Sequence, residues 1–374
     1  MNITILQAGA TLIGTIIGAG ILGIPYAVSK VGFLPGIVML IILSLAMIIL
    51  QLMFAEITLR TKHKHQIPGY GGFYLGYHVK RLSLMIGLLA GYGTLLAYMI
   101  GEGTVLSSLF GGSSLHWGLA FFVVGSVIVY KGLDIVKRFE LGLEVFVLLI
   151  VTSIGVLAWP HIKSDNVYYW NLSQMAVPYG VLLFALSGTI VIPQIRQELI
   201  GQEKKLPVVI IGANLIVFLV YALFLFFVVG VTGKETTELA TVGLGIVVGR
   251  NVFVLGNILA FFTMSTSFLA IGIAMRSLFQ FDYGFSREKA LLATILVPLA
   301  LFVLGARDFI SVLGLVGGVL LSIQSAIVIF AFWKSLINGN RKPEFKLGVL
   351  SYTGFVLLII FIIGAVLTLF NVSG

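Results

Sequence analysis

Two short stretches that combine glycine with proline are the parts of this sequence best suited to bind a charged ligand. One reads "GILGIP" from Gly20 to Pro25, and the other reads "GTIVIP" from Gly188 to Pro193. Proline removes a backbone hydrogen bond, and glycine lets another molecule approach the backbone closely. A helix broken at such a stretch exposes N–H groups and the positive end of a helix dipole. Both favour an anionic group such as a carboxylate.

One acidic residue stands inside an apolar segment. Glu102 lies in "YMIGEGTVL", and Tyr98 lies four residues before it, on the same face of a helix. Charging a carboxyl in hydrocarbon costs about 3 kcal/mol or more, so an ionisable residue there is treated as functional by default. Glu102 is our candidate proton carrier. The alternative is that Glu102 lies near the outer end of its helix, where it reaches water or caps a neighbouring helix. Tyr98 is a candidate ligand contact, the alternative being an ordinary buried tyrosine.

The composition shows what kind of element must position these residues. Of the 374 residues, 59% are hydrophobic and 10% are charged, whereas soluble domains carry about 25% charged residues. Apolar runs of about 20 residues, long enough to cross a bilayer, recur along the whole chain. The sequence therefore predicts an all-α polytopic membrane protein. The first apolar segment has no basic leader and is expected to be retained. The absence of cysteine excludes disulfides and thiolate metal sites.

Hydrophobicity predicts eleven transmembrane helices. Their expected ranges are 4–29, 33–60, 82–110, 115–131, 139–160, 175–197, 206–231, 247–279, 288–305, 309–335 and 347–370. The basic residues indicate their orientation, because cytoplasmic segments collect lysine and arginine. With a cytoplasmic N-terminus and an external C-terminus, 18 of the 23 basic residues lie on the cytoplasmic side. The five exceptions are Lys30, Lys163, Lys234, Arg250 and Arg307. This asymmetry in a cell membrane explains the net charge of +9 without a nucleic-acid partner.

The two glycine–proline stretches occupy corresponding positions in two groups of five helices. Because five is odd, the second group must begin on the opposite side of the membrane. The sequence thus predicts one transmembrane domain built as an inverted repeat, with units at 1–160 and 175–335 and an eleventh helix at 347–370. Interrupted helices at matching positions of two repeats indicate a transporter binding site. The alternative is that glycine and proline merely aid helix packing.

Several motifs resemble those of the amino acid/auxin permease family, within the amino acid–polyamine–organocation superfamily of LeuT-type folds. "GTIIGAGILGIP" resembles the first-helix motif of that family, and "VIPQIRQEL" resembles its sixth-helix proline followed by an acidic residue. "FFTMSTSFLAIGIAMRSLFQFDYG" is similar to the eighth helix of the bacterial tryptophan/tyrosine permease branch. "AEITLR" resembles the acidic end of the second helix. The likeness is specific in helices 1, 6 and 8.

The resemblance implies a LeuT-type 5+5 inverted repeat that binds one amino acid between the broken helices 1 and 6. The carboxylate would meet N–H groups of the first break, and the amino group would meet carbonyls of the second. Thr266 and Ser267 match a position that completes a Na⁺ site with helix 1 carbonyls in sodium-coupled relatives, and oxygen ligands suit such a hard cation. The implied substrate-binding residues are Ile17, Gly18, Ala19, Gly20, Tyr98, Phe184, Ala185, Ser187, Gly188 and Thr189.

The sequence departs from the family pattern in two places. Some proton-coupled members of the superfamily carry a lysine in helix 5, whereas helix 5 has none here after Arg138. Glu102 stands where aromatic permeases have small residues. Thr266 and Ser267 favour Na⁺, and Glu102 together with the branch resemblance favours H⁺, so the coupling ion stays open. No other cofactor is expected.

Charged residues near the cytoplasmic helix ends form a candidate inner gate. We assign Glu198, Arg276 and Asp282 to it, with Arg276 paired to one of the two acids. Simple anchoring of these residues at the membrane interface is the alternative. Phe184 and Phe268 are the two phenylalanines expected near a substrate.

These features predict a secondary active amino acid transporter that works by alternating access. No nucleotide-binding motif or catalytic constellation is present, so neither a pump nor an enzyme is expected. The alternative from another class is a transporter-like receptor that binds an amino acid without concentrating it. A third reading keeps transport but carries an amine or polyamine, for which Glu102 is the one acid deep enough. The sequence does not indicate which amino acid is carried or how many subunits assemble.

Overall fold

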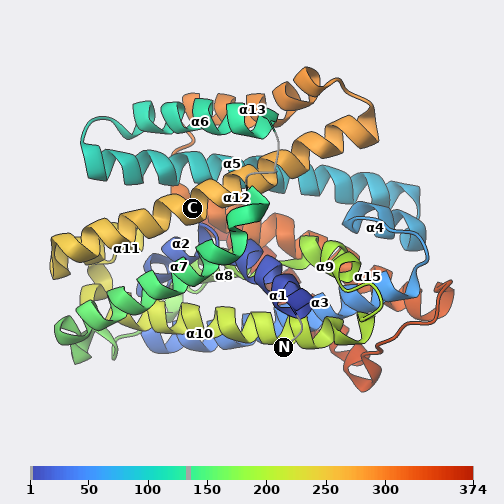
Figure 1. Cartoon of the computed structure of the whole chain (residues 1–374). Helices are drawn as coiled ribbons and strands as arrows, with labels where there is room; N and C mark the ends of the chain where they lie inside the picture. Colours follow the sequence, from blue (N-terminus) through green and yellow to red (C-terminus); the bar gives the residue numbers. More distant parts are fainter. Residues whose placement is uncertain (1–2, 132–135, 374) are drawn as a thin grey trace.

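The structure is a computed structural model that describes residues 3–131 and 136–373, and its described elements are helices (Figure 1). The helices that form the first predicted repeat are α1 (Ile3–Ile16), α2 (Gly20–Ser29), α3 (Phe33–Arg60), α4 (Ile67–Leu75), α5 (Tyr77–Phe110), α6 (Ser114–Lys131) and α7 (Val136–Ala158). Those that follow are α8 (Ala176–Ala185), α9 (Ile192–Glu198), α10 (Leu206–Thr232), α11 (Ala240–Val248), α12 (Arg250–Tyr283), α13 (Arg287–Val303), α14 (Phe309–Leu315), α15 (Ser322–Asn338) and α16 (Gly354–Ser373).

A helix lies at each of the eleven predicted positions. Among the described residues, eight helices are long and apolar enough to cross a membrane, and the bent pair α1–α2 makes a ninth span. The other two predicted spans correspond to α7 and to α13, which has 17 residues. Two boundaries differ from the prediction. The segment before α5 contains the separate helix α4, and α11 is separated from α12 by Gly249, whose φ of 126° ends the shorter helix.

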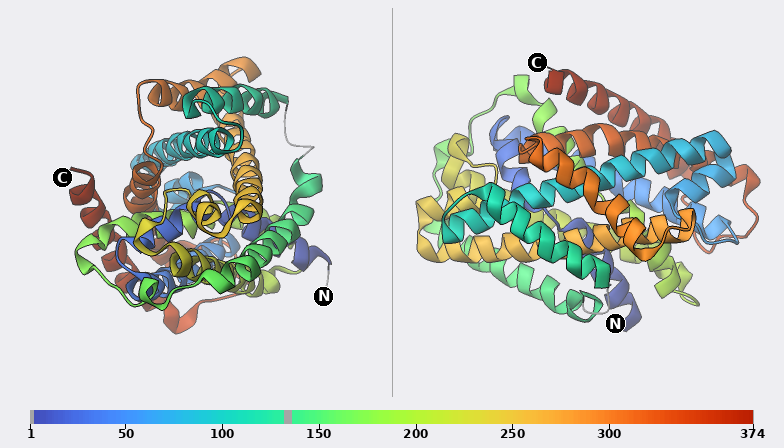
Figure 2. Two further views of the ribbon diagram at one scale, coloured as in Figure 1. Left: turned by 90° about the vertical axis from the view of Figure 1, so that its left-hand side faces the viewer. Right: turned by 90° about the horizontal axis from the view of Figure 1, so that it is seen from above.

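The helices pack as two groups around a central region. On one side, α5 lies against α6, α12 and α13, and the views in Figures 1 and 2 show α6 and α13 side by side. On the other side, α10 packs on α1, α2 and α3. The outer face of α10 carries exposed apolar side chains at Val208, Ile211, Leu215, Leu219 and Leu223. Their spacing of three or four residues makes one apolar stripe that suits lipid.

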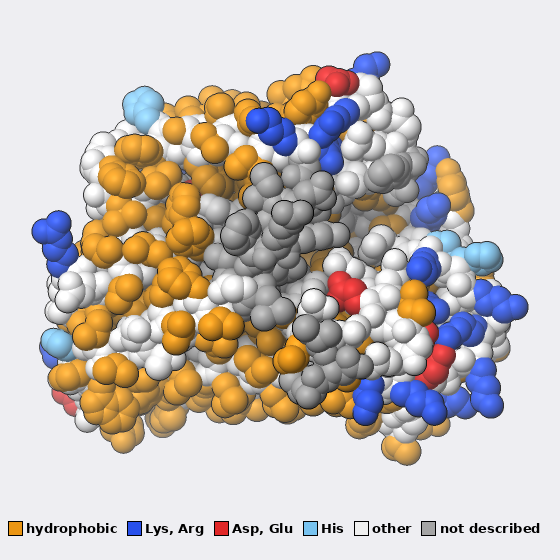
Figure 3. All heavy atoms as spheres, in the orientation of Figure 1, with side chains coloured by type: hydrophobic (Ala, Val, Ile, Leu, Met, Phe, Trp, Pro, Cys, Tyr) orange, Lys and Arg blue, Asp and Glu red, His pale blue; other side chains and the backbone are white. Residues whose placement is uncertain are grey.

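Charge separates the two ends of the bundle. On the face seen in Figure 3, lysine and arginine side chains gather at the end where α4 lies, and apolar side chains cover much of the surface toward the opposite end. A multi-pass protein in a bilayer needs such an apolar surface, because the surface that faces lipid is not in contact with water. The basic end is the end that sequence analysis assigned to the cytoplasm.

Backbone-to-backbone contact joins α8 to the span formed by α14 and α15. A one-turn π-helix, Val316–Leu321, interrupts that span where it crosses α8. A Cβ atom added at Gly317 would lie 2.7 Å from the backbone nitrogen of Phe184 and in still closer contact with the carbonyl oxygen of Gly180. Only glycine permits this approach of the two helices.

We expect Gly317→Ala to destabilise the protein by about 3 kcal/mol, because α8 cannot yield without moving its backbone. Thermal unfolding of the purified protein in detergent measures the effect. Gly314→Ala is the matched control, since a Cβ added at Gly314, three residues earlier, meets nothing within 4 Å. Equal unfolding temperatures for the two variants would contradict the contact.

Candidate functional site

The first break bends the N-terminal span by 49° between α1 and α2. Three predicted ligand-binding residues, Ile17, Gly18 and Ala19, lie in the bend. The N–H of Gly18 donates to the carbonyl oxygen of Ile16 at 2.9 Å, so the regular helical pattern is lost there. Because α2 begins at Gly20, its first N–H groups have no acceptor in their own helix. They present donors and a positive dipole end at the bend.

The second break separates α8 from α9. Phe184 and Ala185 end α8, Ser187 and Gly188 lie in the gap, and Thr189 begins a single 3₁₀ turn. The hydroxyl of Ser187 donates to the carbonyl oxygen of Phe184 at 2.7 Å. Pro193 stands in the first turn of α9, where a missing N–H does not cost a helical hydrogen bond. The break therefore leaves carbonyl groups at the end of α8 without a continuing helix.

The two breaks lie against each other. A Cβ atom added at Gly20 would stand 2.4 Å from the Cβ of Ala185, and one added at Gly188 would stand 2.6 Å from Cγ1 of Ile16. Gly20 and Gly188 are thus the residues that let each broken span approach the other. The structure brings together the two stretches whose matching positions drew attention in the sequence.

Tyr221 of α10 joins the two breaks through its hydroxyl group. Its oxygen lies 2.8 Å from the carbonyl oxygen of Ile16 and 3.0 Å from that of Ala185, so its single O–H is shared between the last turns of α1 and α8. The side chain is 1% exposed. Tyr221 was not predicted, because a single tyrosine in the apolar run "IVFLVYALFLFF" has no spacing that marks it.

Two side-chain hydroxyl groups lie close to Gly18. A Cβ atom added there would lie 2.9 Å from Oγ of Ser267 on α12 and 3.2 Å from the hydroxyl oxygen of Tyr98 on α5. Tyr98 is buried at the centre of the packed helices. Three residues predicted separately from helices 1, 3 and 8 therefore meet at the first break.

Glu102 lies one turn beyond Tyr98 on α5 and is fully buried. One carboxyl oxygen accepts a hydrogen bond from Oγ of Ser265 at 2.8 Å. The other is buried without a hydrogen-bond partner among the described residues. Neither of the ion pairs found in the described part of the chain involves Glu102. Ser265 was not predicted, although its place two residues before Ser267 puts it on the same helix.

The two hydroxyls proposed for a cation site are placed differently. Thr266 donates to the carbonyl oxygen of Phe262 on its own helix at 2.8 Å, whereas Ser267 approaches Gly18. Phe184 is buried at the end of α8. Phe268 packs in an edge-to-face contact with Phe121, so it is held by α6.

Of the predicted gate residues, Arg276 and Glu198 can be compared, and they contact different partners. The guanidinium of Arg276 donates to the carbonyls of Val129 and Tyr130, at 2.8 Å for Tyr130, and so caps the end of α6. Glu198 accepts from Gln194 at 2.9 Å on its own helix. The expected pair between Arg276 and Glu198 is therefore not formed, because α6 supplies acceptors to Arg276. The side chain of Asp282 lies outside the described residues.

Another arginine, which sequence analysis did not assign, caps a different helix at this end. Arg196 of α9 donates to the carbonyls of Thr58 and Thr61 at the end of α3, at 3.3 Å for Thr61. Arg196 thus joins α9 to α3, and Arg276 joins α12 to α6. Each arginine ties together helices of one packing group.

Comparisons with known proteins place this arrangement in a family. The sequence model of the tryptophan/tyrosine permease family matches residues 1–371. "Glutamine transporter 2" of Aliivibrio fischeri is 22% identical over 86% of this chain and 86% of its own. "Tyrosine-specific transport system 1" of Haemophilus influenzae is 24% identical over 98% of this chain and 96% of its own.

A solved structure shares the architecture. MhsT in complex with L-phenylalanine matches with a TM-score of 0.72 and 16% sequence identity, over 97% of this chain and 98% of that one. This match and the apolar spans confirm the predicted all-α, LeuT-type fold in a multi-pass membrane protein. With a family model that covers nearly the whole chain, this protein belongs to the tryptophan/tyrosine permease family of amino acid transporters and is not an enzyme.

Proposed function

We propose that the protein is a secondary active transporter that imports a neutral or aromatic amino acid across the cell membrane by alternating access. The observation that carries the proposal is the meeting of both broken helices at Tyr221, in a bundle that also buries a carboxyl at Glu102, one turn along α5 from Tyr98. Two relatives named for glutamine and tyrosine support this substrate class. In this proposal the N-terminus is cytoplasmic and the C-terminus external, which is supported by the gathering of lysine and arginine at the end of the bundle where α4 lies.

The breaks supply opposite partial charges to an amino acid zwitterion. The first N–H groups of α2, at Gly20, favour its carboxylate. The carbonyls that end α8, from Phe184 onward, favour its ammonium group. Tyr98 and Ser267 line the same position beside Gly18. No side chain of opposite charge is needed, because helix ends provide both partners.

The coupling ion in this proposal is a proton carried by Glu102. Its carboxyl group is buried and has no cationic partner among the described residues, and one oxygen is left for a proton. Thr266 turns its hydroxyl toward its own helix, which weakens a sodium site that needs both hydroxyls. Sodium is the second candidate because Ser267 still approaches the bend at Gly18, where α1 leaves carbonyl oxygens.

The contacts at the basic end fit a rocking motion of two rigid groups. Arg196 links α9 to α3, and Arg276 links α12 to α6, so neither contact has to break when one group moves against the other. In this proposal Arg276 stabilises a helix end, and it is not part of a gate.

The test is uptake by the purified protein in liposomes. Labelled tyrosine and glutamine are supplied with a proton gradient alone or a sodium gradient alone. Accumulation above the equilibrium level under the proton gradient supports the proposal. Accumulation under the sodium gradient alone would mean that the coupling ion is Na⁺ and not H⁺. Specific binding without accumulation under either gradient would overturn transport in favour of a receptor.

Tyr221→Phe is expected to lower amino acid uptake about tenfold. It leaves the buried carbonyl oxygen of Ala185 without its side-chain donor, and that of Ile16 with the Gly18 N–H alone, which costs about 1–3 kcal/mol and loosens the contact between the two breaks. Initial uptake rates in liposomes measure this loss.

The matched control removes the hydroxyl of another tyrosine that also donates to a carbonyl of a neighbouring helix. Tyr92 on α5 donates to the carbonyl oxygen of Ala293 at 2.8 Å, between two helices and away from the breaks. Tyr92→Phe should keep uptake within about twofold of the unchanged protein, since it alters neither break. An equal loss in both variants would mean that Tyr221 only stabilises the fold.

A further inference from the structure

Positive charge without acidic partners surrounds α4, at the end of the bundle that the proposed function places in the cytoplasm. Residues 57–101 contain five lysines and arginines and no acidic residue. Arg60 is paired with Glu56 at 2.6 Å. The other four are exposed and make no ion pair with a described residue. We call these four residues the basic patch: Lys62, Lys64, Lys80 and Arg81.

Two glycines of α4 bring the separate parts of the basic patch together. A Cβ atom added at Gly69 would lie 2.8 Å from Cβ of His65, in the loop before α4. One added at Gly72 would lie 2.9 Å from Cβ of Lys80 on α5. Burial lowers the pKa of the His65 imidazole, and the charges of His63 and Lys80 lower it further. The loop and the start of α5 are therefore close enough for their charges to act on each other.

The basic patch continues into an apolar face of α5. Four exposed side chains follow one another at intervals of four residues and so share one face of the helix: Tyr77, Arg81, Met85 and Leu89. The Arg81 guanidinium lies 4.5 Å from the centre of the Tyr77 ring. With 34 residues, α5 is about 51 Å long, whereas the hydrocarbon of a bilayer is about 30 Å thick. The basic first turns of α5 therefore lie outside the hydrocarbon, and its apolar face enters it.

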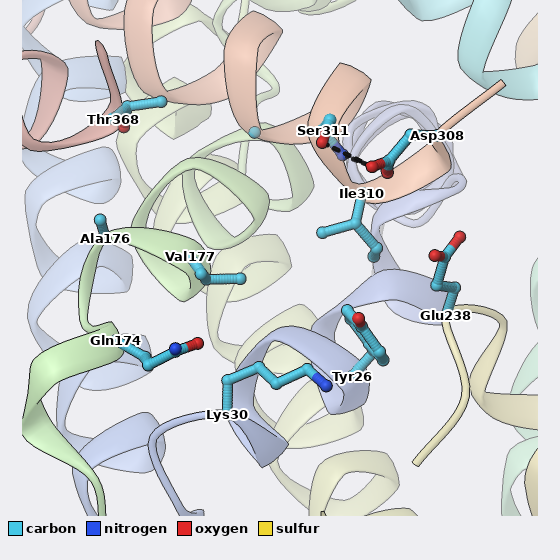
Figure 4. Close-up of a pocket in the computed structure, with 11 residues that line it drawn as sticks. Tyr26, Lys30, Gln174, Ala176, Val177, Glu238, Asp308, Ile310, Ser311 and Thr368 are labelled. Atoms are coloured by element: carbon cyan, nitrogen blue, oxygen red, sulfur yellow. Dashed lines mark hydrogen bonds between the residues drawn. The ribbon is translucent and has the colours of Figure 1, made fainter. Parts of the chain in front are cut away.

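Charges at the opposite end of the bundle are arranged differently. α3 has 28 residues, or about 42 Å, and separates Lys30, which precedes it, from Lys62, which follows it. Figure 4 shows Lys30, Glu238 and Asp308 lining one cavity of about 270 Å³. Positive and negative side chains stand together there, whereas the basic patch has no acid in its own segment of the chain.

We propose that the basic patch binds an anionic phospholipid of the cytoplasmic leaflet. Its phosphate lies at Lys80 and Arg81, and its acyl chains lie along Met85 and Leu89. Charge complementarity favours the headgroup, because lysines and arginines beside a membrane span attract anionic lipids. The apolar face that follows directly favours a lipid over a free phosphate, which would use only the charged part of the site. The leaflet follows from the orientation in the proposed function, whereas the binding itself requires no transport.

Native mass spectrometry of the purified full chain, with phospholipid added in detergent, measures this binding. Palmitoyl-oleoyl phosphatidylglycerol should bind about 30-fold more tightly than palmitoyl-oleoyl phosphatidylcholine, whose headgroup has no net charge. Lys80→Met combined with Arg81→Met keeps unbranched apolar stems and removes both charges. This double variant should lower the affinity for phosphatidylglycerol about 30-fold, since each cation near an anionic surface contributes about a factor of five. Its affinity for phosphatidylcholine should not change.

Two control variants separate the basic patch from net charge and from misfolding. Lys342→Met combined with Lys346→Met also removes two exposed cations, but from a loop in which Glu344 stands between them. Its affinity for phosphatidylglycerol should stay within about twofold of that of the unchanged protein. Lys80→Arg combined with Arg81→Lys keeps both charges on α5 and should bind phosphatidylglycerol as the unchanged protein does.

Three results would overturn the inference. Equal affinity of the unchanged protein for the two phospholipids would remove the preference for an anionic headgroup. An equal loss in the two methionine double variants would remove the location. Displacement of the bound lipid by glycerol 3-phosphate at the same concentration would mean that the basic patch binds a free phosphate without the apolar face. None of these results bears on the uptake assays, so the proposed function stands or fails separately.

Discussion

Adding one methyl group at Gly20 is expected to lower amino acid uptake about 100-fold. The new Cβ atom would stand 2.4 Å from the Cβ of Ala185 and 2.5 Å from its Cα. Because the second atom belongs to the backbone, a side-chain rotation cannot relieve the clash. Separating α2 from α8 costs about 3 kcal/mol and moves the N–H groups of one break away from the carbonyls of the other. Initial uptake rates in liposomes measure the effect.

Gly9→Ala is the control for that experiment. Gly9 lies on α1, in the same broken span, and a Cβ added there meets nothing within 4 Å. Uptake should stay within about twofold of the unchanged protein, because alanine in an open helical position is favourable. Both variants should elute from size exclusion as the unchanged protein does. Normal uptake by Gly20→Ala would mean that the two breaks need not touch during transport.

Removing the carboxyl of Glu102 should abolish accumulation driven by a proton gradient. Glu102→Gln keeps the size of the side chain and its ability to accept from Ser265, 2.8 Å away, but it cannot take up and release a proton. Exchange of labelled for unlabelled amino acid, which needs no gradient, should continue. The measurement is therefore a pair of assays on one preparation: accumulation under a proton gradient, and exchange without one.

Ser265→Ala separates the proton-carrying role of Glu102 from its hydrogen bond. That variant keeps the carboxyl and loses only the donor, so proton-driven accumulation should persist at a reduced rate. If Glu102→Gln still accumulates substrate under a proton gradient, the carboxyl is not the proton carrier. Accumulation driven by sodium and lost in Ser267→Ala would then place the coupling ion at the first break.

The positions of the spans and of both breaks could be predicted from the sequence for a physical reason. A bilayer demands long apolar runs, and glycine with proline is costly inside them, so "GILGIP" and "GTIVIP" stood out. The fold class followed from their matching positions, and the structural match confirms it. Glu102 could be singled out because a charge in hydrocarbon is rare.

Contacts between distant segments could not be read in this way. Nothing local marks Tyr221, whose role depends on two carbonyls 205 and 36 residues away along the chain. Arg276 was assigned to one of two acidic partners because opposite charges attract, yet one nitrogen of its guanidinium donates to carbonyls at the end of α6 and not to Glu198. Helix ends are strong acceptors that a sequence pattern does not display. The preference for Ser267 over Thr266 likewise depends on how α12 is turned.

The broken spans also constrain how the protein can be inserted during synthesis. α1 and α2 have 14 and 10 residues, or about 21 and 15 Å, and α8 and α9 have 10 and 7. Each half is shorter than the roughly 30 Å of hydrocarbon, and the gap between halves carries backbone groups that lipid cannot satisfy. The first span therefore reaches its final state only when α8 and the Tyr221 hydroxyl of α10 have followed it into the bilayer. Until then, a nascent chain needs water or a chaperone at residues 17–19.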